Sequence, residues 1–217
     1  MDEAKNYKQS HNKIRFKCKK CGRCCENSKI RLSPYDILRL CKRLSIPTME
    51  FLKKYAYPIY DKENKDLLTC MLKTSPRCLF LAEEGCVVYN DRPYACRVYP
   101  LAVDPFYNGN LFEKKFYILE ECIGFDTKNK VSLAEFKEDQ KVDDAEFYDP
   151  WVIFKIKIIN SDCANTEEFY SRFFNVCYDF DNVFFKQALT DNNIQWPDNI
   201  GGRYKIIIKL ANKILLA

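Results

Sequence analysis

Four cysteines lie within eight residues near the start of this chain, in the segment Cys18-Lys-Lys-Cys21-Gly-Arg-Cys24-Cys25. A run of this form holds several thiol groups close to one point, and soft thiolate ligands select zinc, copper(I) or iron–sulfur clusters. The alternative is a set of unrelated free thiols. The density of the run favours a metal site, around which this part of the chain must fold.

A second group of cysteines follows in a loop-rich stretch that is rich in Pro and Gly. These are Cys78, Cys86, Cys96 and Cys122. Eight thiols in two groups of four make metal binding the leading hypothesis, and two sites of four thiolates each would use all eight. One cluster with spare thiols is the alternative, because free cysteine is also commonly buried as a small hydrophobe.

The spacing within the first run favours iron–sulfur over zinc. Cys18, Cys21 and Cys24 have the spacing that ferredoxin-type loops use for three corners of a 4Fe-4S cluster, with the fourth ligand coming from afar. Zinc sites more often use two separate C-x2-C pairs, sometimes with histidine, and His11 is the only histidine here. Neighbouring side chains point in different directions. Cys25 therefore either serves a second centre or lies beside the first one.

The other cysteines read differently. Cys41 and Cys177 lie on apolar faces of predicted helices, and Cys70 lies in the apolar string Leu-Leu-Thr-Cys-Met-Leu. We expect these three to pack in the core. Cys163 has no informative context.

The start of the chain predicts a cytoplasmic protein with reduced thiols. Residues 1–13 are hydrophilic and do not resemble a signal peptide, and no apolar run approaches the length of a membrane span. Six disulfides among the twelve cysteines are therefore disfavoured, since thiols stay reduced in the cytosol. We expect no membrane partner.

Composition excludes some classes of function. The chain has 217 residues, of which 47% are hydrophobic, so it can bury a substantial core without help from a metal. It has only six glycines, and neither G-x-G-x-x-G nor G-x-x-x-x-G-K-[ST] occurs. Nucleotide-binding folds built on those motifs are therefore excluded.

Basic residues are concentrated at the start of the chain, where residues 1–45 hold 13 Lys and Arg against 4 Asp and Glu. Such a segment is compatible with nucleic-acid binding. It also fits the offsetting of the negative charge of a thiolate-bound metal, or an ordinary solvated surface. We favour the last two interpretations over a nucleic-acid partner.

Patterns along the chain predict an α+β protein that is mainly helical, with short strands and a loop-rich, cysteine-ligated metal-binding core. We expect a flexible N-terminus (1–15), a cysteine-cluster metal-binding domain (16–127) and a helical C-terminal part packed on it (128–217). Asn108-Gly109 predicts a hairpin turn.

Several helix starts have clear local signals. Ser33, Pro34 and Asp36 predict an N-cap and first turn, and a second helix is expected to start at Thr48. Ser132-Leu-Ala-Glu135 has the form of a capping box. Asn165-Thr-Glu-Glu168 is expected to open a helix with an apolar face, and a final amphipathic helix is expected after Gly201-Gly202. The apolar face predicted for the helix that opens near Asn165 comprises Phe169, Phe173, Val176, Cys177, Phe180 and Phe184.

Longer strings around the cysteines resemble a known family. They are Phe16-x-Cys18-x2-Cys21-Gly22-x-Cys24-Cys25; Ile30-x-Leu32-Ser33-x2-Asp36-Ile37-x-Arg39-Leu40 with Phe51-Leu52; Cys78-Leu-Phe-Leu81; and Cys86-x2-Tyr89-x2-Arg92-Pro93-x2-Cys96-Arg97-x-Tyr99-Pro100. In order and spacing, residues 16–124 resemble the CxxCxxCC zinc- or iron-chelating family, the YkgJ-like cysteine-cluster proteins. The resemblance implies eight metal-binding cysteines: Cys18, Cys21, Cys24, Cys25, Cys78, Cys86, Cys96 and Cys122.

Two arginines and three tyrosines lie close to the cysteines in the sequence. Arg92 and Arg97 are candidates for hydrogen bonds to thiolate or sulfide sulfur, the alternative being an ion pair or a solvated side chain. Tyr89, Tyr94 and Tyr99 are expected to pack around the site.

Three functions compete for this chain. The first is a metalloprotein whose iron–sulfur cluster or zinc is structural or exchanges electrons with a redox partner. The second is a cluster-containing enzyme acting on a protein substrate, because the flagellin lysine N-methylases carry a similar cysteine cluster. The third is a zinc-stabilised, nucleic-acid-associated protein. We favour the first, and a deep pocket beside the metal would favour the second.

Overall fold

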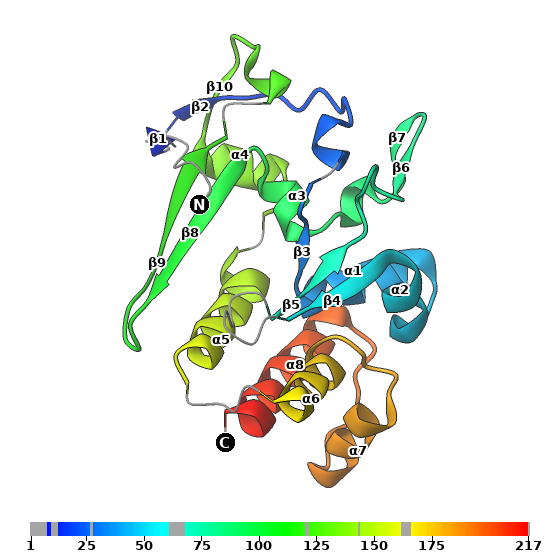
Figure 1. Ribbon diagram of the computed structural model, residues 1–217. Helices are drawn as coiled ribbons and strands as arrows, with labels where there is room; N and C mark the ends of the chain where they lie inside the picture. Colours follow the sequence, from blue (N-terminus) through cyan, green and yellow to red (C-terminus); the bar gives the residue numbers. More distant parts are fainter. Residues whose placement is uncertain are drawn as a thin grey trace.

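The computed structural model describes residues 8–9, 13–26, 28–60, 68–119, 122–142, 144–161 and 166–216, with the backbone alone for 8, 9 and 144. Figure 1 shows one part built around a long hairpin and a second part in which helices surround a small sheet.

Helices dominate the second part. In the described residues the α-helices are α1 (Pro34–Leu44), α2 (Thr48–Tyr55), α3 (Tyr94–Val98), α4 (Leu133–Asp139), α5 (Asp149–Ile159), α6 (Glu167–Cys177), α7 (Val183–Asp191) and α8 (Ile200–Leu215). Shorter turns are η1 (Arg23–Cys25), η3 (Tyr89–Asp91), η4 (Ile123–Phe125) and the π-helical turn η5 (Asp144–Tyr148). None of the helices in these residues is long and apolar enough to cross a membrane.

The strands are short, and all their pairings within the described residues are antiparallel. They are β1 (Lys8–Gln9), β2 (Lys13–Arg15), β3 (Arg31–Leu32), β4 (Ala56–Ile59), β5 (Thr69–Leu72), β6 (Leu81–Ala82), β7 (Gly85–Cys86), β8 (Leu101–Tyr107), β9 (Phe112–Ile118) and β10 (Lys130–Ser132). They form the sheets β1-β9-β8, β10-β2, β3-β5-β4 and β6-β7. Helices beside antiparallel strands confirm the α+β class.

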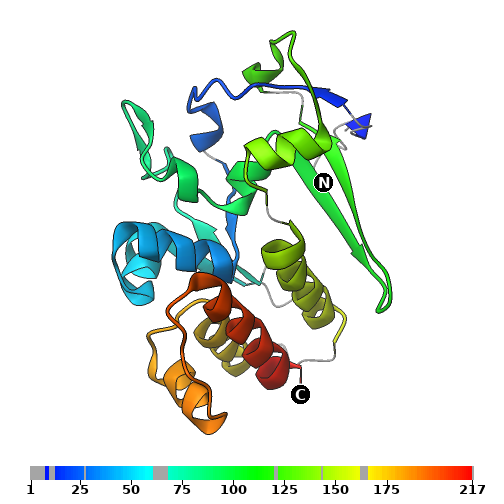
Figure 2. The same cartoon turned by 180° about the vertical axis from the view of Figure 1, so that it is seen from behind.

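The larger of two hydrophobic cores joins segments that are far apart in the sequence. It includes Leu40 of α1, Phe51 of α2, Leu72 of β5, Phe173 of α6 and Ile207 of α8. Helix α8 contacts both α1 and α6 (Figure 1 and Figure 2). Burial of these apolar side chains is the main stabilising term of this part.

The smaller core lies under the long β8–β9 hairpin. Its buried members include Ile14, Phe16, Val98, Leu101, Phe116 and Phe136, from β2, α3, β8, β9 and α4. The hairpin turns at Asn108-Gly109, as predicted, and Tyr107 pairs with Phe112. Gly109 has a φ of +100°, a conformation that a residue without a Cβ adopts readily.

Local signals in the sequence placed several helices correctly. Ser33 caps α1 in a capping box with Asp36, α2 begins at Thr48, and Ser132 caps α4 with Glu135. Helix α8 begins at Ile200 and therefore includes the two glycines that we expected to precede it.

The helix predicted to open near Asn165 is shorter than expected. Helix α6 is capped by Thr166 and ends at Cys177, so Phe180 and Phe184 do not belong to its apolar face. Asp179 and Asp181 explain the end. Their carboxylates accept hydrogen bonds from Thr48, whose backbone N–H lies 2.5 Å from Asp181 Oδ2 and whose hydroxyl lies 3.1 Å from Asp179 Oδ1. The chain leaves α6 to cap α2.

The predicted division of the chain stays a prediction. The larger core draws residues from both sides of the expected boundary near residue 127. The described pieces of the expected flexible N-terminus are strands, because Lys8–Gln9 pair with β9 and Lys13–Arg15 pair with β10.

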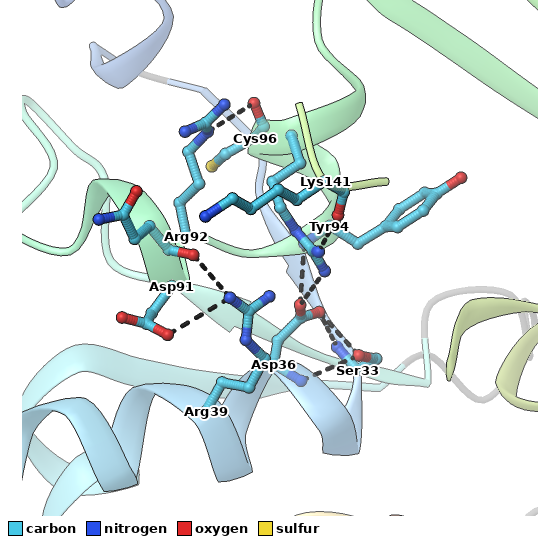
Figure 3. A network of polar contacts seen from close by, with 10 residues as sticks. Ser33, Asp36, Arg39, Asp91, Arg92, Tyr94, Cys96 and Lys141 are labelled. Carbon is cyan, nitrogen blue, oxygen red and sulfur yellow. Dashed lines mark hydrogen bonds and ion pairs between the residues drawn. The ribbon is translucent and has the colours of Figure 1, made fainter. Parts of the chain in front are cut away.

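The buried carboxylate of Asp36 connects the two parts (Figure 3). Only 1% of the residue is exposed. Oδ2 accepts hydrogen bonds from the N–H (2.9 Å) and the hydroxyl (2.7 Å) of Ser33, and Oδ1 accepts one from the N–H of Tyr94 (2.8 Å). Arg97 Nη2 lies 4.0 Å from Oδ1. Asp36 thus holds the start of α1 against α3, the helix that carries Cys96.

Replacing Asp36 with alanine is expected to destabilise the fold. The change removes a helix cap and leaves the buried Arg97 guanidinium without its carboxylate, so the free energy of unfolding should fall by about 3 kcal/mol. Urea unfolding followed by circular dichroism measures this. Asp91→Ala is the control, because that half-exposed carboxylate pairs with Arg39 at 3.3 Å and should cost less than about 1 kcal/mol. Equal losses in the two variants would contradict the role of Asp36.

Candidate metal centre

All eight cysteines predicted to bind metal line one cavity of about 430 Å³. They are Cys18, Cys21, Cys24, Cys25, Cys78, Cys86, Cys96 and Cys122. Phe16 from the smaller core and Leu72, Phe80 and Val88 from the larger core also line it. The cysteine cavity therefore lies between the two cores, and residues more than 100 positions apart meet there.

The first four cysteines lie on either side of Gly22, in a backbone turn that depends on this glycine. This residue has a φ of +78°, and its carbonyl accepts a 2.8 Å hydrogen bond from the N–H of Cys25, which closes η1. Cys18 and Cys21 are exposed, whereas Cys24 and Cys25 are half-buried. A Cβ on Gly22 would lie 3.1 Å from Cδ2 of Leu81. Glycine thus allows both the turn and the close approach of β6.

Two of the later cysteines are placed by backbone contacts with this turn and with a small hairpin. The N–H of Cys78 donates to the carbonyl of Cys25 at 2.8 Å. Cys86 ends β7 and pairs with Leu81 in β6. The β6–β7 hairpin thereby brings Cys86 back beside the segment of Cys78.

Cys96 and Cys122 are placed by contacts of their own segments. Cys96 lies in α3, which Asp36 holds in place. Cys122 precedes η4, and its Sγ accepts a 3.3 Å hydrogen bond from the N–H of Gly124. The carbonyl of Gly124 accepts a 2.9 Å bond from the N–H of Lys17. This bond holds the segment of Cys122 next to that of Cys18.

The motif segments match one family model. The model named CxxCxxCC, described as "Putative zinc- or iron-chelating domain", matches residues 17–131, which is more than half of the chain. The chain belongs to the CxxCxxCC family. The match covers all eight cysteines of the cavity, and the description of the family supports metal binding. Searches of the curated proteins and of the solved structures found no match.

The thiols of the CxxCxxCC domain perturb one another. A hydrogen bond from the Cys25 thiol, helped by the charge of Arg92, lowers the pKa of Cys24 to about 7, and the same bond raises the pKa of Cys25. Cys24 thus has the most readily formed thiolate of the pair.

The four later thiols of the cavity, of which Cys78 is buried and the others are half-buried, have raised pKa values. Burial raises the pKa values of Cys78, Cys86, Cys96 and Cys122, and nearby thiolates add to the effect. For Cys122 the neighbours are Cys24, Cys18 and Cys21. For Cys96 they include Cys24, Cys78 and Cys86. Cys24 is the neighbour common to both.

The two candidate arginines differ in position. Arg92 lines the cysteine cavity and donates to the carbonyl of Tyr89 (2.8 Å) and to Oε1 of Gln140 (2.6 Å), with its guanidinium 3.8 Å from the ring centre of Tyr89. Its charge favours the thiolates of Cys24 and Cys86. Sequence reasoning missed Gln140, which also lines the cavity, because no local pattern marks a contact 48 residues away.

Arg97 lies apart from the cavity walls. It is buried in its ion pair with Asp36 and donates to the carbonyl of Lys141. This is the ion-pair alternative considered above. Arg97 lies next to Cys96 in α3, and any effect on a bound metal stays a prediction. Of the three tyrosines, Tyr89 and Tyr99 line the cysteine cavity, and Tyr94 belongs to the smaller core.

The cysteines assigned to packing are in the larger core, which confirms that prediction. Cys41, Cys70 and Cys177 are buried there. Burial raises the pKa of Cys41 and of Cys70 to about 12, so these thiols are not reactive. Cys163 lies outside the described residues.

The chemistry of the donor set fits a soft metal. Eight sulfur ligands favour zinc or iron–sulfur over magnesium or calcium, which prefer oxygen. Among the described side chains, no group of three His, Cys, Asp or Glu is gathered tightly enough to hold a metal ion. The eight thiols line the walls of a shared cavity, and they are the residues that would hold the metal.

Replacing Gly22 with alanine is expected to lower metal content. The residue would be strained at a φ of +78° and would crowd Leu81, which displaces η1 with Cys24 and Cys25. Elemental analysis of the purified variant measures the loss of metal. We also expect the free energy of unfolding to fall by about 1 kcal/mol. Gly109→Ala is the matched control, since it has a φ of +100° and open space around it. It should lose similar stability but no metal, and wild-type metal content in Gly22→Ala would contradict this account.

Proposed function

We propose that the chain is a metalloprotein in which the eight cysteines hold iron–sulfur centres. The observation that carries the proposal is the convergence of all eight thiols on one cavity. A volume of about 430 Å³ has room for polynuclear centres as well as for a single ion, and the C-x2-C-x2-C spacing is our reason for preferring iron–sulfur. Zinc held by the same thiolates is the alternative.

We divide the thiols into two groups of four, with Cys24 next to both. Cys18, Cys21 and Cys24 have the three-corner spacing of a 4Fe-4S loop. Cys122 supplies the distant fourth ligand, because its neighbouring thiols are those three and Lys17–Gly124 holds its segment in place.

The second group consists of the remaining four thiols. Cys25 has Cys78 and Cys96 among its thiol neighbours, and Cys78 in turn has Cys86. The backbone bond between Cys78 and Cys25 joins two members directly. Cys24 and Cys25 are adjacent in η1, and we assign them to different centres.

The two groups differ in exposure, which suggests different roles. The first includes the exposed Cys18 and Cys21, and the second includes the buried Cys78. An iron–sulfur centre supplies one-electron transfer when bound, and a solvent-near position allows exchange with a redox partner. We assign a redox role to the first group and a structural role to the second. The exposed Lys19, Lys20 and Arg23 beside the first group would attract an acidic redox partner.

Serine variants test the assignment. In protein purified without oxygen, Cys21→Ser and Cys96→Ser should each lose about half of the iron and acid-labile sulfide, because each removes a ligand from a different group. Iron, zinc and sulfide analysis with visible absorption spectra measures this. Cys96→Ser should also lower the unfolding midpoint more than Cys21→Ser does.

Cys177→Ser is the control, since that thiol is buried in the larger core. It should retain wild-type metal content even where stability falls. Equal metal loss in all three variants would contradict the division of the cysteines. Colourless protein containing zinc would exclude the iron–sulfur proposal and leave a zinc site.

Metal binding should depend steeply on pH. Burial raises the pKa values of Cys78, Cys86, Cys96 and Cys122, so these thiols carry protons at pH 7 in the metal-free protein. A bound metal displaces these protons, so its apparent affinity rises with pH. Competitive zinc titrations of metal-free protein between pH 6 and 8 should show an increase of more than about tenfold per pH unit. A zinc affinity that does not change with pH would exclude these four cysteines as ligands.

A further inference from the structure

A second cavity, of about 690 Å³, adjoins the cysteine cavity. It is lined by residues of β3, α3, β8 and α5, and α5 and β8 are in contact. The cavity therefore lies where the part with the long hairpin meets the helical part; Figure 1 shows where these elements lie. The volume is within the range typical of small-molecule sites. Cys24 and Cys96 line both cavities.

Helix α5 presents apolar side chains to two different surroundings. Trp151, Phe154 and Ile158 are in the larger core. Val152, Ile156 and Ile159, spaced four and three residues apart, line the second cavity and belong to neither core. A helix that is apolar on opposite faces is expected to have both faces covered. Val152 is 9% exposed, and Ile156 and Ile159 are half-buried, so the part of this face that lines the cavity can contact an apolar ligand.

The rim of this cavity is positively charged. Lys29 and Arg31 line it, are exposed, and form no ion pair within the described residues. Lys155 also lines the cavity, but its ammonium group donates to the carbonyl of Leu68 and lies over the ring of Phe173. Asp36 also lines the cavity, but its oxygens already bind Ser33, the N–H of Tyr94 and Arg97. The available charge therefore favours an anionic group.

Aromatic rings form much of the remaining wall. Tyr94, Tyr99, Tyr148 and Trp151 line the cavity, and the rings of Tyr94 and Tyr148 are stacked with centroids 3.6 Å apart. Tyr94 and Trp151 are almost fully buried, so the aromatic surface open to a ligand comes mainly from the half-buried Tyr99 and Tyr148. Such a surface favours a ligand that is itself aromatic, through stacked or edge-on contacts.

We propose that the second cavity binds a small aromatic anion. Its apolar body lies against Val152, Ile156 and Ile159, and its charged group lies at Lys29 and Arg31. Because the cavity shares Cys24 and Cys96 with the candidate metal centre, the ligand lies beside the metal-binding thiols. The site itself does not depend on which metal the cysteines hold.

Fluorescence titration with 8-anilinonaphthalene-1-sulfonate, a small aromatic anion, tests the proposal on the full chain as purified. The wild type should bind one molecule with saturation. Val152→Trp fills the cavity and should weaken binding by at least about tenfold. Arg31→Glu reverses a rim charge and should weaken it by about fivefold. The neutral analogue N-phenyl-1-naphthylamine should bind more weakly to the wild type, and Arg31→Glu should not change its affinity.

Val183→Trp is the matched control, because this valine is 82% exposed at the start of α7, outside the cavity. It should bind the anionic probe as the wild type does. Absence of saturable binding to the wild type would overturn the proposal, as would wild-type affinity in a folded Val152→Trp. Should Val152→Trp fail to fold, as judged by circular dichroism, Arg31→Glu decides: unchanged affinity for the anion overturns the proposal. Metal content measured on the same samples reports separately on the cysteine site.

Discussion

The carboxylate of Asp36 is buried away from water, so all its hydrogen-bond and ion-pair partners must come from the protein. Those partners come from two places: Ser33 at the start of its own helix, and Tyr94 and Arg97 in α3. A buried charge that loses one partner is costly, so this requirement holds α1 and α3 together. Since α1 belongs to the larger core and α3 packs in the smaller one, the position of each core relative to the other depends on the same carboxylate.

The cysteine cavity is a product of that arrangement. Its thiols come from the η1 turn, the loop before β6, the end of β7, α3 and the residue before η4, which are joined by a few backbone bonds. Most of these segments are too short to be stable alone. Their order comes from the cores on either side and, on our proposal, from the metal that the thiols hold. Folding and metal binding are then parts of the same equilibrium.

Sequence reasoning succeeded where a feature depends on neighbouring residues. The caps at Ser33 and Ser132 and the turn at Asn108-Gly109 follow from local chemistry. The eight cysteines chosen by spacing and context line one cavity, and their role as ligands stays a prediction. It failed where distant residues decide. The end of α6 depends on the contact of Asp179 and Asp181 with Thr48, and the placement of Arg92 depends on Gln140. Sequence periodicity carries no information about contacts between residues this far apart in the chain. The second cavity was not predicted for the same reason, because its lining also comes from distant segments.

The wall that the two cavities share has a thermodynamic consequence. Cys24 and Cys96 line both cavities, so if both proposals hold, the free energy of binding on one side depends on what is bound on the other. Such linkage is reciprocal: the factor by which a metal changes the affinity of the second ligand equals the factor by which that ligand changes the affinity of the metal. On these proposals the chain has two coupled binding sites, and the concentration of one ligand sets the apparent affinity for the other.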